Sequence, residues 1–271
     1  MKNKQIIVGV ILIFIFVFAA FAAPYIVPND PNSINMGLKN APPSAEFPFG
    51  NDALGRCEFS RVIYGARYSL IFAIPVTMSL AVIALFVGSF IAYRGGIVDT
   101  ILGILCDIFM AFPLIVIAIS LVNIIDGGMM SIVISLSIAT ITWFLRMIRS
   151  YTKTERDKSY IECSKISGAS DFRIVLTHII PNVLPQYIVY VTTNIAAVII
   201  GISSFSFLGV GYEKEIPEWG AMLSEAINSI YTKPTLILYP GICIVLCCAG
   251  FNLLGEGLRD SIGKEGNDSV L

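Results

Sequence analysis

Residues 69–93 have the sequence SLIFAIPVTMSLAVIALFVGSFIAY, which contains no charged residue. A helix that crosses the hydrocarbon core of a bilayer needs about 20 mainly apolar residues, because that core is about 30 Å thick. This run is therefore long enough to cross a membrane as one α-helix. It is continuously apolar and does not alternate between polar and apolar residues, which argues against a strand of a transmembrane β-barrel.

Five further apolar runs bring the number of predicted transmembrane helices to six: 6–23, 101–125, 129–145, 183–208 and 234–255. The chain of 271 residues is 56% hydrophobic and only 14% charged. A soluble domain of this size could not bury so much apolar surface. The sequence therefore predicts an all-α integral membrane protein in contact with a lipid bilayer. The net charge of −1 gives no basic face for a nucleic acid, so we expect no nucleic-acid partner.

The basic residues predict the orientation. If the N-terminus is cytoplasmic, twelve of the 18 Lys and Arg residues lie in cytoplasmic segments, which places both termini in the cytoplasm. The first run, preceded by Lys2 and Lys4, also has features of a cleavable signal peptide. Its 18 apolar residues exceed the usual apolar core of such a peptide and favour a retained helix.

The segment 146–182 is the longest predicted cytoplasmic loop and holds seven of the Lys and Arg residues. Its part 155–167 lacks Gly and Pro and predicts a polar helix, which Gly168 ends. Ser170 is placed to cap a second short helix, which we expect Pro181 to end before the fifth span. One face of this second helix is apolar because four residues recur at helical spacing: Phe172, Val175, Leu176 and Ile179.

A short amphipathic helix in this position has two interpretations. It rests on the membrane or under its own bundle, or it docks into a groove of a separate cytosolic protein. Small residues at the bend would let a partner backbone approach closely: Cys163, Ser164, Gly168 and Ala169. The residues alone leave both interpretations open.

The chain lacks the motifs of an enzyme or a nucleotide-driven motor. Its only Gly-Lys pair, Gly263-Lys264, is not part of a phosphate-binding loop. With one histidine, His178, and no metal-finger cysteine spacing, we expect no catalytic, cofactor or metal site. Asp107 is the one ionisable residue within a span, which predicts either a functional group or an ion pair with Arg146 or Arg149. An ion-coupled carrier or channel that works alone is the alternative function.

The cytoplasmic segment resembles the signature of binding-protein-dependent ABC importer permeases. That signature is Glu-Ala-Ala, three residues, Gly, nine residues, then Ile-x-Leu-Pro. Here Glu162-Cys163-Ser164, Gly168 and the ending 178–181 stand at the same spacing. Cys-Ser replaces Ala-Ala, and His178 replaces the first apolar residue of the ending.

Three further segments resemble the second permease subunit of the dipeptide, oligopeptide and nickel branch of this family. They are 50–70 before the second span, 206–211 followed by 217–220 at the outer gate, and 251–260 at the end of the last span. Cys57 stands where that branch usually has an acidic residue.

The resemblance implies the fold of a type I ABC importer permease in a prokaryotic plasma (inner) membrane. It implies a second homologous permease subunit, two cytosolic ATP-binding subunits and an extracytoplasmic substrate-binding protein as partners. The cargo would be short peptides, or nickel or another chelated transition metal. The chain would divide into 1–67 (first helix and extracytoplasmic segment), 68–260 (permease core with the coupling loop 146–182) and 261–271 (cytoplasmic tail).

The resemblance also implies site residues. Coupling to the ATPase is expected from Glu162, Cys163, Ser164, Gly168, Ala169, Ser170, Phe172, Arg173, Val175, Leu176 and Pro181. The translocation pathway or its gate is expected to include Asp107, Pro113, Phe207, Glu218 and Trp219.

Overall fold

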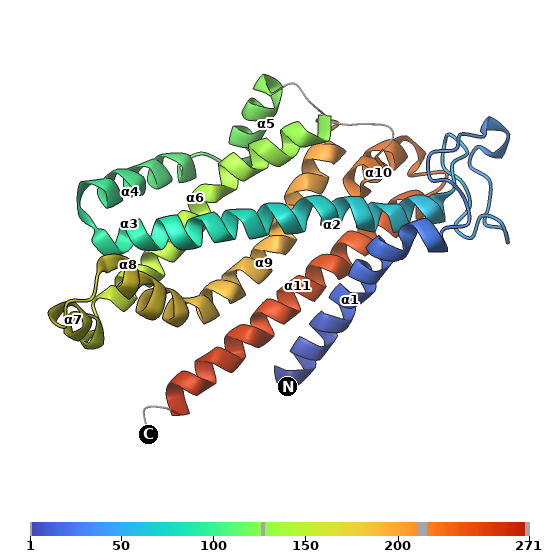
Figure 1. Ribbon diagram of the computed structural model, residues 1–271. Helices are drawn as coiled ribbons and strands as arrows, with labels where there is room; N and C mark the ends of the chain where they lie inside the picture. The colour runs from blue at the N-terminus through green and yellow to red at the C-terminus, as the bar shows by residue number, and fades with distance from the viewer. Residues whose placement is uncertain (1, 126–127, 211–215, 269–271) are drawn as a thin grey trace.

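The computed structural model describes residues 2–125, 128–210 and 216–268 (Figure 1). This part of the chain consists mainly of α-helices: α1 Lys2–Ile26, α2 Glu58–Ile83, α3 Ser89–Arg94, α4 Gly96–Met110, α5 Leu114–Ile124, α6 Gly128–Arg156, α7 Ser159–Ile166, α8 Asp171–Ile174, α9 Ile180–Phe207, α10 Trp219–Ala226 and α11 Thr235–Asp268. Two π-helical turns, Ala84–Gly88 and Val175–Ile179, join α2 to α3 and α8 to α9. Two short 3₁₀ turns complete the set, Met36–Leu38 and Ile227–Ser229.

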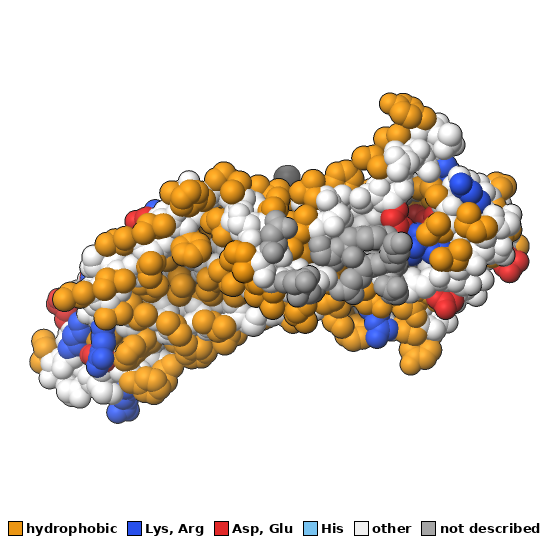
Figure 2. Space-filling view, turned by 90° about the horizontal axis from the view of Figure 1, so that it is seen from above, with side chains coloured by type: hydrophobic (Ala, Val, Ile, Leu, Met, Phe, Trp, Pro, Cys, Tyr) orange, Lys and Arg blue, Asp and Glu red, His pale blue; other side chains and the backbone are white. Residues whose placement is uncertain are grey.

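Five helical stretches of the described chain are long and apolar enough to cross a membrane: Lys4–Ile26, Glu58–Arg94, Gly128–Arg156, Asp171–Phe207 and Thr235–Ile262. The pair α4 and α5 adds a sixth apolar stretch. Figure 2 shows charged side chains gathered toward the two ends of the molecule, and mainly hydrophobic side chains among the described residues on the face between them. This distribution is what a bilayer requires, because lipid tails give no compensation to an exposed charge.

The predicted third span, 101–125, is not one helix. It is divided between α4 and α5, which meet at an angle of 88°. The break coincides with Pro113, the N-cap of α5. Proline has no N–H for the helical ladder and disfavours helical backbone in the residue before it, which explains why the helix stops at this point.

The boundaries around the cytoplasmic loop also differ from the prediction. The expected helix 155–167 is split, because α6 continues to Arg156 and α7 begins at Ser159. Pro181 does not end the second helix, since α8 continues through a π-helical turn into α9 as one rod, Asp171–Phe207. The wider turn directly before Pro181 makes room for a ring that would clash with a preceding carbonyl in a regular helix.

The buried core forms two clusters. One contains Trp219 and Phe205 and packs seven helices together, α1, α2, α5, α6, α9, α10 and α11. The other lies toward α7 and contains Phe144, Ile161 and Ile174. The interior therefore continues from the first cluster to the base of the cytoplasmic loop.

The first and last helices, α1 and α11, lie side by side (Figure 1). Their backbones approach so closely that a Cβ at Gly9 would lie 2.7 Å from the backbone nitrogen of Leu254. Only glycine permits this approach.

Candidate functional site

The predicted coupling residues form a projecting tip, α7 together with the turn 167–170 and α8. In Figure 1 this tip lies at one end of the molecule, and the segment 27–57 lies at the other. Gly168 has a φ of +82°, the left-handed conformation expected of a helix-ending glycine. Ser170 caps α8 as predicted, because its Oγ accepts a hydrogen bond from the backbone N–H of Arg173 at 3.4 Å. The bend predicted from the sequence is therefore confirmed.

The tip is anchored to the bundle by apolar side chains. Ile161 of α7 and Ile174 of α8 are fully buried, and they pack in one cluster with Phe144 and Ile148 of α6. The apolar face predicted for the second helix is divided. Val175 is buried in this cluster with Ile179, whereas Phe172 and Leu176 are exposed. Half of that face therefore stabilises the fold and half faces outward.

Polar contacts complete the anchor. Arg94, at the end of α3, donates from Nε to Asp171 Oδ2 at 3.1 Å. Lys158 pairs with Glu155 at 2.8 Å, and Tyr160 donates its hydroxyl hydrogen to the same carboxylate. Partial burial and the adjacent Glu155 charge raise the pKa of the Tyr160 phenol above its ordinary value. Tyr160 therefore stays protonated and keeps this hydrogen bond at neutral pH.

The outer surface of the tip combines large apolar side chains with charges. Ile166 is 87% exposed and Phe172 is 64% exposed. The other expected coupling residues are also at the surface, with Ser164 and Ala169 half-buried: Glu162, Cys163, Gly168, Ser170, Arg173 and Pro181. Exposed apolar groups with a charged rim are typical of a protein-docking surface.

Glu218 and Trp219, two of the expected gate residues, are fully buried. Glu218 is the N-cap of α10, and Oε2 accepts the Ala221 N–H at 3.1 Å. Its Oε1 accepts hydroxyl hydrogens from Ser69 at 3.1 Å and Ser203 at 2.6 Å. Burial raises the pKa of Glu218, although these hydrogen bonds oppose the shift. The geometry joins α10 to α2 and α9.

Trp219 strengthens the same junction. Its Nε1 donates to the backbone carbonyl of Val62 at 3.0 Å, and its ring packs edge-on against Phe16. Both residues therefore fix α10 in place, and neither lines a described cavity.

The remaining expected pathway residues lie on other elements. Asp107 pairs with Arg146 at 2.7 Å, one of the two pairings predicted from the sequence, and both side chains are more than half exposed. Pro113 lies at the bend between α4 and α5, and Phe207 ends α9. The structure brings Glu218 and Trp219 together but does not join the five residues into one site.

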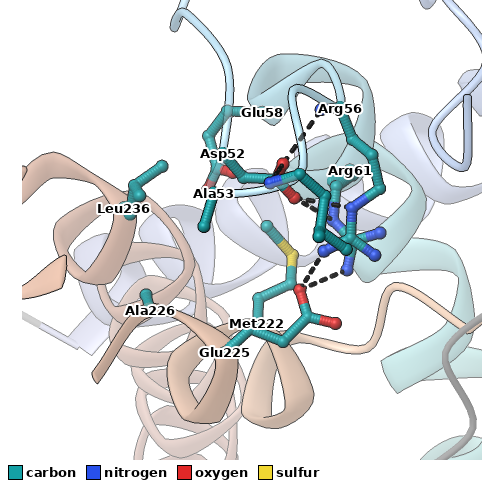
Figure 3. A pocket seen from close by; sticks show the side chains of 10 residues that line it. Asp52, Ala53, Arg56, Glu58, Arg61, Met222, Glu225, Ala226 and Leu236 are labelled. Atoms are coloured by element: carbon teal, nitrogen blue, oxygen red, sulfur yellow. Dashed lines mark hydrogen bonds and ion pairs between the residues drawn. The ribbon is translucent and has the colours of Figure 1, made fainter. Parts of the chain in front are cut away.

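A second polar cluster was not predicted. Two arginines, Arg56 and Arg61, are buried beside the carboxylates of Asp52 and Glu225 around a cavity of about 230 Å³ (Figure 3). Arg56 Nε lies 2.6 Å from Asp52 Oδ2 and also pairs with Glu225, and Arg61 lies 3.0 Å from Glu225 Oε2. The network ties the segment before α2 to α10.

The signal for this cluster was present in the sequence. Several charges fall within 52–61, directly before a membrane span, where exposed charges would be ordinary. Their burial could not be read from that segment alone, because the closing carboxylate, Glu225, is far away in sequence.

The sequence of this chain matches known families and proteins along most of its length. Residues 81–264 match the family described as binding-protein-dependent transport system inner membrane component. Residues 1–43 match the N-terminal TM domain of oligopeptide transport permease C. The dipeptide transport system permease protein DppC of Alkalihalophilus pseudofirmus is 35% identical over 261 residues, which cover 96% of this chain and 86% of that protein. The glutathione transport system permease protein GsiD of Escherichia coli O6:K15:H31 is 37% identical over 263 residues, which cover 93% of this chain and 82% of that protein.

Proposed function

Because the chain belongs to the family of binding-protein-dependent transport inner membrane components, and so is a multi-pass inner-membrane permease, we propose that it forms half of the translocation pathway of an ATP-driven importer of short peptides. The other half would be a second, homologous permease subunit. Two cytosolic ATP-binding subunits would supply the energy, and an extracytoplasmic binding protein would deliver the cargo. This polypeptide would itself carry no catalytic activity.

The observation that carries the proposal is the exposed tip. Ile166 and Phe172 project from a segment whose base is buried in the bundle. A helix that only rested under its own bundle would turn its large apolar side chains inward. The exposed surface therefore suits either a groove in a partner or the membrane surface, and the family signature that the segment 162–181 resembles favours a groove in the ATP-binding subunit.

The anchor supplies a route for the motion. A displacement of the tip would act on α6 through Ile161 and Ile174, and on α3 through the Arg94–Asp171 pair. Closure of the ATPase pair would in this way switch the bundle between outward-facing and inward-facing states. Both chain termini would lie in the cytoplasm, on the same side as the tip.

The peptide cargo follows from the relatives. The two named above transport a dipeptide and glutathione, which is itself a tripeptide. Nickel or another chelated metal was the alternative cargo, and neither relative named here is a metal transporter. A peptide is therefore the cargo that the comparisons favour.

The test is uptake by the assembled importer in proteoliposomes with the four partner subunits. We expect accumulation of a radiolabelled dipeptide only when ATP and the binding protein are both present. Uptake by this chain alone under an ion gradient, without an ATPase, would instead support the ion-coupled carrier. Uptake of a nickel chelate in place of the dipeptide would correct the cargo and leave the permease role intact.

A second test uses the exposed thiol of Cys163. A short crosslinker that reacts with this thiol at one end and inserts into any nearby C–H or N–H bond on illumination at the other should join the residue to the ATP-binding subunit in native vesicles. The Cys163→Ser variant, which keeps the buried Cys57, is the control and should give no adduct. Failure of the native chain to crosslink at normal abundance would contradict docking at the tip.

A further inference from the structure

The cavity beside Arg56 and Arg61 contains a carboxyl group that takes no part in the ion pairs. Three carboxylates line it, Asp52, Glu58 and Glu225, against the two guanidinium groups. Asp52 and Glu225 are paired with the arginines. Glu58 makes no such ion pair within the described chain, so its carboxyl group lies in the lining without a charged partner of its own.

Glu58 is only 2% exposed, and its Oε1 finds no hydrogen-bond partner among the described residues. An uncompensated polar group in this position is costly, and in folded proteins such groups are nearly always satisfied. The Nζ of the nearby Lys233 donates to the backbone carbonyls of Ala41 at 2.6 Å and Asn51 at 2.7 Å, and no hydrogen bond joins it to Glu58 within the described residues.

The shape of the cavity restricts the occupant. Its volume of about 230 Å³ greatly exceeds the roughly 15 Å³ that one water needs on a comparable measure. Apolar side chains form the remaining wall: Ala53, Leu54, Met222, Ala226 and Leu236. No group of three or more His, Cys, Asp or Glu residues in the described ranges could hold a metal ion. An organic cation with an apolar body therefore suits the site better than a bare metal.

We propose that this cavity binds the primary ammonium group of a small organic ligand, with Glu58 as its counter-ion. An ammonium group carries three donors, which satisfy a carboxylate oxygen and leave two for further acceptors. The ligand could be the amino terminus of a short peptide, a source that rests on the proposed function, or a free alkylamine. The chemistry at Glu58 is the same for both.

The test is equilibrium binding to the full chain in lipid nanodiscs, without ATP. The probes are dialanine, N-acetyl-dialanine and n-butylammonium. We expect the native chain to bind dialanine and n-butylammonium, and to bind N-acetyl-dialanine at least tenfold more weakly. Glu58→Gln should weaken both amines at least tenfold. The matched control, Glu46→Gln, changes an exposed carboxylate outside the cavity and should leave binding unchanged.

Two readouts keep the test independent of folding. Glu58→Gln replaces a buried carboxyl group that has no ion-pair partner with a neutral amide of the same shape, so its thermal unfolding midpoint should equal or exceed that of the native chain. Ala53→Leu narrows the cavity without changing a charge and should also weaken dialanine.

Tighter binding of dialanine than of n-butylammonium would identify a peptide terminus, and the reverse order would identify a general amine. Three results would overturn the proposal. They are equal affinity of the native chain and Glu58→Gln for the amines, equal affinity of the native chain for dialanine and N-acetyl-dialanine, and no binding of either amine. ATP-dependent uptake is a separate measurement, so the proposed function can fail while this site stands.

Discussion

Gly168 is the residue on which the tip depends most directly. Its φ of +82° lies in the region that L-residues with a Cβ adopt only at a cost of about 1–2 kcal/mol, and β-branched residues at more. An added Cβ would meet nothing within 4 Å, so the obstacle is the backbone and not crowding. We expect Gly168→Val to distort the bend and reduce ATP-driven uptake at least tenfold, at normal abundance in the membrane.

The matched control for this variant is Gly241→Ala. Gly241 also has open space around it but lies within α11 and has no positive φ. Uptake should be measured for both variants at equal protein amount. Normal uptake by Gly168→Val would argue against coupling through this bend.

Glu218 makes stability depend on pH in a defined direction. Burial raises its pKa above the ordinary 4.5, so between that value and the raised one the folded chain holds a proton that the unfolded chain has lost. Its contribution to stability is therefore lost as the pH rises through this window. In Glu218→Gln, the amide oxygen can still accept the Ala221 N–H and the amide nitrogen can donate to Ser203 Oγ. Because this amide does not titrate, the variant should not lose stability across the same pH range.

The measurement is the thermal unfolding midpoint of both proteins across the range from pH 4 to neutral. We expect the native midpoint to fall relative to that of Glu218→Gln as the pH rises. Parallel curves would show that the carboxylate keeps its charge in the fold.

At the scale of one element, α7 contains two isoleucines with opposite roles. Ile161 is fully buried and Ile166 is 87% exposed. Ile161→Ala should lower the free energy of unfolding by about 2–4 kcal/mol, as is usual for a truncated core side chain. Ile166→Ser should leave the unfolding midpoint unchanged and reduce uptake, because it removes a docking contact. A stable Ile166→Ser variant with native uptake would contradict the assignment of this surface.

The ion pairs that join neighbouring elements should differ greatly in strength. Glu225→Ala would leave the buried Arg56 and Arg61 without one of their carboxylates, which we expect to cost about 3 kcal/mol. Asp107→Ala breaks a pair whose side chains are both more than half exposed and whose Arg146 can extend toward the cytoplasmic interface, so it should cost less than Glu225→Ala. Unfolding midpoints of the two variants check this order, and equal effects would mean that the outer network is not a structural clamp.

Elements formed by interactions between residues close in sequence could be predicted, and those formed by residues far apart in sequence could not. The apolar runs and the Gly168 bend were predictable, because hydrophobic length and a left-handed glycine are local signals. The effects of Pro113 and Pro181 on their helices were not predictable from the sequence. A proline breaks a helix unless the turn before it widens into a π-helical turn, and the local sequence does not show which of the two occurs. The burial of Arg61 was hidden for a different reason: its partner Glu225 is distant in sequence and meets it only after α10 has packed.

At the scale of the whole molecule, the tip and the segment 27–57 occupy opposite ends (Figure 1). This arrangement predicts that the two ends lie on opposite sides of the membrane. A membrane-impermeant maleimide should label Cys163 only from the cytoplasmic side, and a cysteine introduced by Ser44→Cys only from the outside. Both native positions are exposed. Labelling of the two positions from the same side would overturn the topology.

The close seam between Gly9 and Leu254 has a consequence for biogenesis. Helices leave the ribosome in order, so α1 enters the lipid long before α11 has been translated, and its face around Gly9 must wait for α11. A nascent chain that stalls before α11 would display an unmatched groove to the quality-control proteases of the membrane. Close docking of α1 therefore has to await complete translation of α11.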